Sequence, residues 1–160
     1  MSREGGNLAD ISCAFCIGDA SRIAEAFLGH YKRAFRMGDV ADRFVEFPVT
    51  YVDLIEHLPN AIADSQGVPR IPTVEPRRIA GDEDMWVEEL PSVWVDIVAS
   101  VDMKHMPALL DIWGRLSHVD YESDASTWNS PTMASCLLQL VGVASLSLSR
   151  GKPLLGLFAV

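Results

Sequence analysis

The stretch that decides the fold is ISCAFCI at residues 11–17. Its larger apolar side chains occur at every second position, which is the period of a β-strand. A second apolar stretch, LLGLFAV at residues 154–160, also predicts a strand. Neither strand can satisfy its backbone N–H and C=O groups alone. We therefore expect the two strands to pair with each other under a cover of helices.

A helix is expected to follow the first strand. Gly18 favours a turn, and Asp19 or Ser21 can cap the helix because a short side-chain oxygen accepts from free N–H groups of the first turn. Apolar residues then recur at helical spacing over residues 23–34. Gly38 is expected to end this helix.

The next part of the chain is harder to assign. Residues 39–47 are expected to form a second, shorter helix that stops before Pro48. Residues 49–58, VTYVDLIEHL, could form a helix or a strand, because β-branched residues are mixed with apolar residues at helical spacing. We favour a helix. Prolines and glycines at five positions then predict a long surface connection over residues 59–81.

Two further amphipathic helices are expected after this connection. The first begins at Pro91 and presents an apolar stripe over residues 94–101, and the second covers residues 107–118. Asp102 is expected to begin the turn between them. Because the joining segment is short, the two helices are expected to pack as an antiparallel hairpin.

The longest uncharged stretch, residues 131–149, predicts a buried helix that ends at Gly151. It is marginal in length for a membrane span of about 20 mostly apolar residues, and it contains several polar side chains. We therefore expect no membrane insertion. Ser145, Ser147 and Ser149 are expected on the less buried side of this helix.

These elements predict an α+β fold: a mostly helical single domain over residues 1–160, with a small sheet formed by the N- and C-terminal strands. A chain of 160 residues can bury a core without disulfides, since domains of this size bury roughly 70% of their unfolded surface. The count of three cysteines is odd, and MSREGGNLAD at residues 1–10 has no apolar run of signal-peptide length. A cytoplasmic location is therefore expected.

The net charge of −9 is concentrated in the middle of the chain. Residues 81–124 carry 11 acids and two bases, a net charge of −9, whereas residues 1–80 carry −2 and residues 125–160 carry +2. Nucleic acid is disfavoured as a partner, because its phosphates require Lys and Arg. If the protein has a charged partner, we expect a basic protein.

The acidic run that begins at Gly81 is the best candidate for a binding surface. Clustered carboxylates can steer and pair with basic residues of a partner, and an aromatic side chain among them can anchor the contact. The alternative is a solvated loop with the tryptophan in the core. The predicted partner-binding residues are Asp82, Glu83, Asp84, Trp86, Glu88 and Glu89.

Cys13 and Cys16 have the spacing of zinc clips and of thiol-disulfide enzymes. On a strand, however, residues three apart point to opposite faces, so the two thiols are not expected to reach one ion or each other. The remaining cysteine and the histidines form no second close pair with zinc-finger spacing. We therefore predict structural cysteines, no metal and no cofactor.

A second set of polar residues could support catalysis or ligand binding. Asp102 and His105 are three apart, and His118 precedes Asp120 and Glu122. Such groups act as an acid-base pair or as ligands only if they converge in a pocket. The chain has neither a G-x-S-x-G motif nor a glycine-rich phosphate loop, so no catalytic residue is assigned.

Two stretches carry a resemblance to a group of proteins. They are MWVEELPSVWVDIVASVDMKHMPALLDIW at residues 85–113 and LLQLVGVASLSLSRGKPLLGLFAV at residues 137–160. In apolar pattern and in a few Trp, Pro and Gly positions, this part of the chain resembles small bacterial accessory proteins, among them candidate toxin-immunity proteins. The resemblance implies no particular functional residues.

Our leading hypothesis is a non-enzymatic protein-binding inhibitor, an immunity-type protein that neutralises a basic toxin or effector through its acidic surface. The alternative is a small enzyme or ligand-binding domain that uses the His and Asp residues of residues 102–122. A third possibility is a self-associating protein, so a homodimer is also considered.

Overall fold

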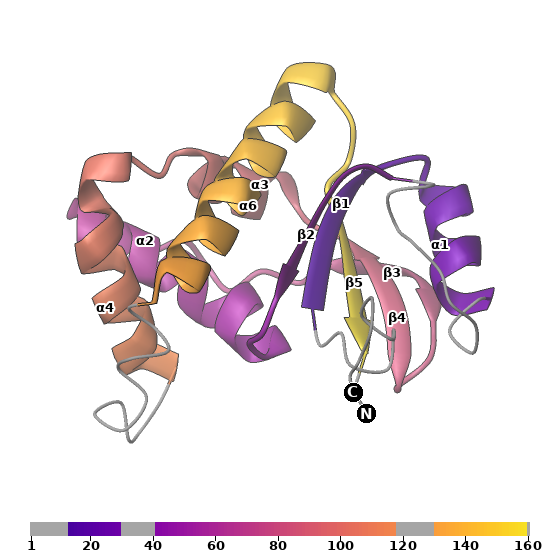
Figure 1. The fold of residues 1–160 in the computed structure, drawn as a ribbon, viewed down its shortest axis with the longest axis horizontal. Helices are drawn as coiled ribbons and strands as arrows, with labels where there is room; N and C mark the ends of the chain where they lie inside the picture. Colours follow the sequence, from indigo (N-terminus) through magenta and orange to yellow (C-terminus); the bar gives the residue numbers. More distant parts are fainter. Residues whose placement is uncertain (1–12, 30–40, 118–129, 160) are drawn as a thin grey trace.

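The computed structural model describes residues 13–29, 41–117 and 130–159, and it has the predicted α+β fold. An antiparallel five-stranded sheet in the order β2-β1-β5-β4-β3 separates two layers of helices. Figure 1 shows α1 (Ala20–Gly29) on one face of the sheet. The helices on the other face are α2 (Leu58–Gln66), α3 (Ser92–Ala99), α4 (Met106–Ser117) and α6 (Pro131–Arg150). The strands are β1 (Cys13–Gly18), β2 (Ala41–Phe47), β3 (Arg77–Gly81), β4 (Met85–Glu89) and β5 (Leu155–Ala159).

The predicted pairing of the terminal strands is confirmed. β1 and β5 lie antiparallel in the middle of the sheet, with Cys13 opposite Phe158 and Phe15 opposite Gly156. The sheet is larger than predicted, because β2 adds to β1 on one side and the β3–β4 hairpin adds to β5 on the other. The strands at the two ends of the chain are therefore the centre of the sheet.

The first helix follows β1 as predicted. It is α1 (Ala20–Gly29), and the Oδ1 atom of Asp19 accepts a hydrogen bond from the backbone N–H of Arg22 at 2.9 Å. Asp19, rather than Ser21, is therefore the capping residue. The predicted helical residues beyond position 29, and the stop at Gly38, lie outside the described residues.

The helix predicted over residues 39–47 is wrong, because residues 41–47 form β2. Val45 and Phe47 are buried on one face of the sheet, and Phe44 packs against the cluster on the other face. This alternation has the period of a strand, and pairing with β1 satisfies the backbone of β2.

The helical interpretation of residues 49–58 is confirmed from residue 51 onward, and the predicted surface connection begins later than expected. The π-helix η3 (Asp53–His57) runs directly into α2 (Leu58–Gln66), and Gly67 at φ 68° ends the helix. Pro59 follows the π-helix closely, and its missing N–H leaves the carbonyl of Leu54 without the backbone donor that a π-helix would supply in this continuous helix. Residues 68–76 form neither helix nor strand, and β3 occupies the rest of the predicted connection, residues 77–81.

Thr50 and Asp53 fix the start of this helix. The backbone N–H of Thr50 donates to Oδ2 of Asp53 at 3.0 Å, and the backbone N–H of Asp53 donates to Oγ1 of Thr50 at 3.2 Å. This reciprocal pair has the pattern of a capping box and satisfies two backbone donors at the helix start.

Both helices predicted after Pro91 are present, but they do not form the predicted hairpin. They are α3 (Ser92–Ala99) and α4 (Met106–Ser117), joined by the 3₁₀ turn η4 (Met103–His105), and Pro91 is the N-cap residue of α3. α3 packs mainly against α6, whereas α4 packs mainly against α2. The apolar stripes of α3 and α4 are therefore buried on different neighbours.

The last helix, α6 (Pro131–Arg150), has the predicted start and the predicted glycine end. By length and composition alone it could cross a membrane, a test that core helices of soluble proteins also meet. Its inward residues, including Leu137 and Leu140, are buried in the core. One serine prediction is wrong, since Ser147 is buried and its hydroxyl donates to the carbonyl of Lys152.

Two tryptophans donate hydrogen bonds to backbone carbonyls of η3 in the core. We call the wide turn from Asp53 to Leu58 the π-turn. The N–H of Leu58 donates to the carbonyl of Asp53, and Pro59 has no N–H to offer the following carbonyl, that of Leu54. Nε1 of Trp113 lies 2.7 Å from the Asp53 carbonyl oxygen, and Nε1 of Trp94 lies 3.3 Å from that of Leu54. Both indoles are fully buried, so α3 and α4 are joined to the π-turn by hydrogen bonds as well as by packing.

Candidate functional site in the β3–β4 hairpin

The turn between β3 and β4 is tightly defined. Gly81 has φ +104°, a conformation that residues with a side chain rarely adopt. Oδ1 of Asp82 accepts from the backbone N–H groups of Asp84 at 2.8 Å and Met85 at 3.1 Å. These two hydrogen bonds lower the pKa of Asp82 and hold its carboxylate ionised at the turn.

The six residues predicted for partner binding do not form one surface. Asp82, Glu83 and Asp84 are exposed at the turn, and we call these three residues the acidic tip. Trp86 and Glu88 are buried, at 8% and 6% exposure, on the face of the sheet that packs against the larger helical layer. Because side chains along β4 alternate between the two faces, Glu89 lies on the face opposite Trp86 and Glu88.

Glu89 is half-buried and lies on the opposite face of β4 from Glu88. Its carboxylate forms an ion pair with the guanidinium of Arg77, which is opposite Glu89 in the strand pairing. Part of the negative charge that the sequence concentrates in residues 81–124 is therefore compensated within the hairpin. The acidic tip is the part of the predicted surface that remains exposed, and within the described residues no ion pair is formed by its three side chains.

Tyr51 holds the buried carboxylate of Glu88. The hydroxyl of Tyr51 donates toward both carboxylate oxygens, at 3.0 and 2.8 Å. Burial raises the pKa of Glu88, and the hydrogen bond from Tyr51 opposes that effect. Burial, followed by the bond to the carboxylate, also raises the pKa of the Tyr51 phenol. Sequence reasoning missed Tyr51, because only the fold brings it to Glu88, 37 positions away.

An aromatic cluster fixes the inner side of the hairpin. The ring of Tyr51 lies 4.7 Å from that of Phe158 and 5.7 Å from that of Trp86, measured between centroids. The guanidinium carbon of Arg78, on β3, lies 5.0 Å from the centroid of Trp86 on β4. The acidic tip is therefore carried on a hairpin anchored in the core.

Replacing Tyr51 with phenylalanine is expected to lower the free energy of unfolding by about 1.5–3 kcal/mol, because a buried carboxylate loses its donor. The substitution removes a contact that lowers the pKa of Glu88, so the loss is expected to shrink as the pH falls and Glu88 becomes protonated. Urea denaturation at several pH values measures this.

The control for this prediction is the same substitution in a Glu88→Gln background. The cost of Tyr51→Phe is expected to be smaller there and nearly independent of pH, because no carboxylate is left to titrate. An equal, pH-independent cost in both backgrounds would show that the charge of Glu88 contributes nothing to the contact.

The two cysteines of the C-x-x-C segment lie on opposite faces of β1, as predicted. Cys13 belongs to the cluster under the larger helical layer, and Cys16 belongs to the cluster under α1. Burial raises the pKa of each thiol to about 12, so both remain protonated at neutral pH. Among the described residues, no three His, Cys, Asp or Glu side chains gather as a metal ion would require.

The alternative site at residues 102–122 is described only in part. Oδ1 of Asp102 accepts from the backbone N–H of Lys104 at 3.0 Å, and this bond lowers the pKa of Asp102. The side chain thus begins the turn into η4, as the sequence predicted for Asp102, and His105 is half-buried in the same turn. The partners proposed for them, His118, Asp120 and Glu122, lie outside the described residues, so this alternative stays a prediction.

Comparison of the chain with protein-family models, with curated proteins and with solved structures found no match.

Proposed function

We propose that this protein is a non-enzymatic binding protein that inhibits a basic protein partner, most concretely an immunity-type protein that neutralises a basic toxin. The acidic tip is the proposed contact. The observation that carries the proposal is the geometry of Asp82, Glu83 and Asp84: three consecutive exposed carboxylates at the end of an anchored hairpin. Such an arrangement presents negative charge to a partner with little ordering cost on binding.

The charge of the whole chain supports the same partner chemistry. A net charge of −9 attracts a basic protein over distances of about a Debye length, ~8 Å at physiological salt, and speeds its association. Inside the hairpin, Arg77 and Arg78 face Glu89 and Trp86, so they stabilise its base. The resemblance to candidate immunity proteins favours an inhibitory role for such binding.

The test is a triple substitution that removes the charge of the acidic tip and keeps its shape. In Asp82→Asn/Glu83→Gln/Asp84→Asn, the amide oxygen introduced at position 82 can still accept the two turn hydrogen bonds. The matched control neutralises three exposed acids elsewhere, Glu25, Glu75 and Asp96, with the same amides. Both variants therefore have the same net charge.

Wild-type protein and both variants are used to capture partners from the source organism, and the affinity of each captured partner is measured by calorimetry. We expect a basic partner whose affinity falls by about 10- to 100-fold with the tip variant and by less than about threefold with the control. An inhibitor also predicts that the wild type blocks the activity of the partner and that the tip variant does so poorly. Equal affinities for the two variants would remove the acidic tip from the contact.

A further inference from the structure

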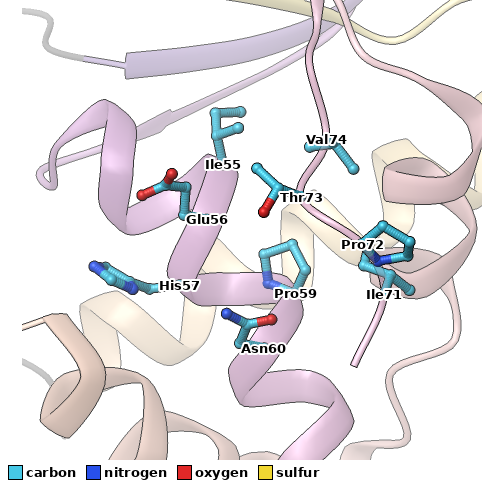
Figure 2. Close-up of a pocket in the computed structure, with 9 residues that line it drawn as sticks. All are labelled: Ile55, Glu56, His57, Pro59, Asn60, Ile71, Pro72, Thr73 and Val74. Atoms are coloured by element: carbon cyan, nitrogen blue, oxygen red, sulfur yellow. The ribbon is translucent and has the colours of Figure 1, made fainter. Parts of the chain in front are cut away.

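A pocket of about 240 Å³ lies away from the hairpin, between the π-turn and the segment that follows α2. Figure 2 shows its two walls, one formed by residues 55–60 of the helix and the other by residues 71–74 of the extended segment. The pocket is lined by Ile55, Glu56, His57, Pro59, Asn60, Ile71, Pro72, Thr73 and Val74.

The helical wall contains the π-turn. The N–H of Leu58 bonds to the carbonyl five residues earlier, that of Asp53, which makes this turn wider than an α-helical one. Glu56 and Asn60, four residues apart across the wide turn, both line the pocket. Single π-turns of this kind occur frequently at functional sites, although here the tryptophan hydrogen bonds also give the turn a role in the core.

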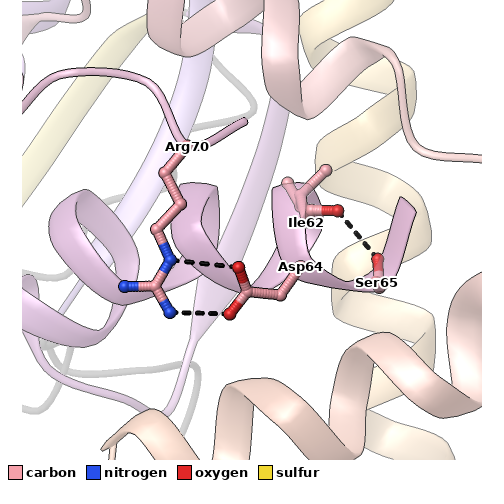
Figure 3. A network of polar contacts seen from close by, with 4 residues as sticks. All are labelled: Ile62, Asp64, Ser65 and Arg70. Atoms are coloured by element: carbon pink, nitrogen blue, oxygen red, sulfur yellow. Dashed lines mark hydrogen bonds and ion pairs between the residues drawn. The ribbon is translucent and has the colours of Figure 1, made fainter. Parts of the chain in front are cut away.

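The second wall is held in place by an ion pair. Figure 3 shows Arg70 turned back onto the end of α2. Its Nε lies 3.0 Å from Oδ1 of Asp64, and a terminal nitrogen lies 2.6 Å from Oδ2. The same view shows Ser65 closing the helix end through a bond to the carbonyl of Ile62. The two-point Arg70–Asp64 contact connects the chain to α2 immediately before residues 71–74 of the second wall.

Four polar side chains in the pocket have no partner in the part of the chain that the structure describes. They are Glu56, His57, Asn60 and Thr73, and neither a hydrogen bond nor an ion pair of their side chains is formed there. Pro59 on the helix and Ile71 and Pro72 on the extended segment add apolar groups to the lining. The pocket therefore combines one carboxylate, one imidazole, one amide and one hydroxyl with short apolar walls.

This lining defines the charge of the ligand that would fit. Among residues 13–29, 41–117 and 130–159, no Lys or Arg lines the pocket, and the chain has a net charge of −9, so an anion would be repelled. Small-molecule pockets usually enclose about 300–1,000 Å³, so a pocket of 240 Å³ suits a group the size of one side chain.

We propose that this pocket binds a cationic group on an aliphatic stem, an ammonium or guanidinium of the kind carried by lysine and arginine. Glu56 pairs with the cation, Asn60 and Thr73 offer hydrogen bonds, and the proline and isoleucine side chains cover the stem. The ligand is either a small free amine or a basic side chain of a protein partner. The proposal does not depend on the acidic tip.

The test is an NMR titration of the full-length ¹⁵N-labelled chain with agmatine and n-butylammonium, and with 1-butanol as the neutral analogue. We expect saturable shifts of the Asn60 side-chain amide and the Thr73 backbone amide with both cations, at dissociation constants on the order of 1 mM. Binding of 1-butanol is expected to be at least about tenfold weaker, because it leaves the Glu56 carboxylate unpaired.

Glu56→Gln is the decisive variant, and Glu75→Gln is its matched control, since Glu75 is exposed on the neighbouring segment and does not line the pocket. The first is expected to weaken cation binding at least about fivefold, and the second is expected to leave it unchanged. Shifts that do not saturate by about 50 mM, equal binding of 1-butanol, or full binding by Glu56→Gln would overturn the proposal.

The source of the cation is distinguished by a second measurement on the same variants. If Glu56→Gln also weakens a partner captured through the acidic tip, the cation belongs to a basic side chain of that partner. If it weakens only the binding of the small amines, the ligand is a free amine. Failure of the acidic tip to bind a partner leaves the NMR result unaffected, so the two proposals fail separately.

Discussion

Replacing Gly81 with alanine is expected to lower the free energy of unfolding by about 3–5 kcal/mol. The backbone of Gly81 has φ +104°, and a Cβ built there would lie 2.3 Å from the carbonyl oxygen of Met85 and 2.5 Å from the Cα of Trp86. Both are backbone atoms, so the clash can be relieved only if the hairpin opens. The acidic tip would then lose its fixed geometry.

Gly142→Ala is the matched control for this substitution. Gly142 lies within α6, and a Cβ added there would meet no atom of the described residues within 4 Å. Alanine is therefore expected to stabilise the protein by about 0.5–1 kcal/mol through helix propensity. Chemical denaturation of the wild type and both variants measures the two effects. A loss below about 1 kcal/mol for Gly81→Ala would contradict the described turn.

Replacing Trp113 with phenylalanine is expected to lower the free energy of unfolding by about 2–4 kcal/mol. Two losses add: a cavity remains where the larger ring was fully buried, and the carbonyl of Asp53 loses one of its two hydrogen bonds, the 2.7 Å bond from the indole. The second loss matters because the π-turn lies in the core, where water does not replace the indole. Urea denaturation measures the change.

Trp86→Phe is the control for the hydrogen bond of Trp113. Trp86 is also buried; its indole N–H lies near the Glu88 carboxylate and helps to lower the pKa of Glu88, but within the described residues it makes no hydrogen bond of normal geometry. We expect Trp86→Phe to lower the free energy of unfolding by less than Trp113→Phe does, with a difference of at least about 1 kcal/mol. If the two substitutions cost the same, the indole of Trp113 contributes only its volume to the π-turn.

Features that depend on local pattern were predicted from the sequence. The alternation in residues 11–17 indicated the first strand, and the periodic apolar stripes indicated the helices after Pro91. Short polar side chains at Asp19 and Asp102 and the glycine at position 151 marked helix starts and ends correctly. In each case the deciding interaction lies within a few residues along the chain.

The errors arose where contacts between residues far apart in the sequence decide the structure. In residues 39–47 Phe44 and Phe47 have helical spacing, whereas Val45 and Phe47 have strand spacing, and only pairing with β1 selects the strand. β3 has little apolar pattern because it is an edge strand with an exposed side. The hairpin predicted for α3 and α4 failed because each helix found a different neighbour.

In the candidate site, too, the local features were predicted and the contacts between distant residues were not. The sequence located the acidic segment and its exposed carboxylates at Asp82, Glu83 and Asp84. It could not indicate that Glu88 faces the core, where Tyr51 binds it, or that Arg77 pairs with Glu89 across the hairpin. These contacts reduce the predicted six-residue surface to its exposed tip.

The central claim is that the acidic tip binds a basic protein through charge. It is tested most directly by the dependence of the partner's affinity on salt concentration, measured for the wild type, the tip variant and the charge-matched control. We predict a steep loss of affinity with salt for the wild type and the control, and a clearly shallower one for the tip variant. The same slope for all three proteins would contradict the claim.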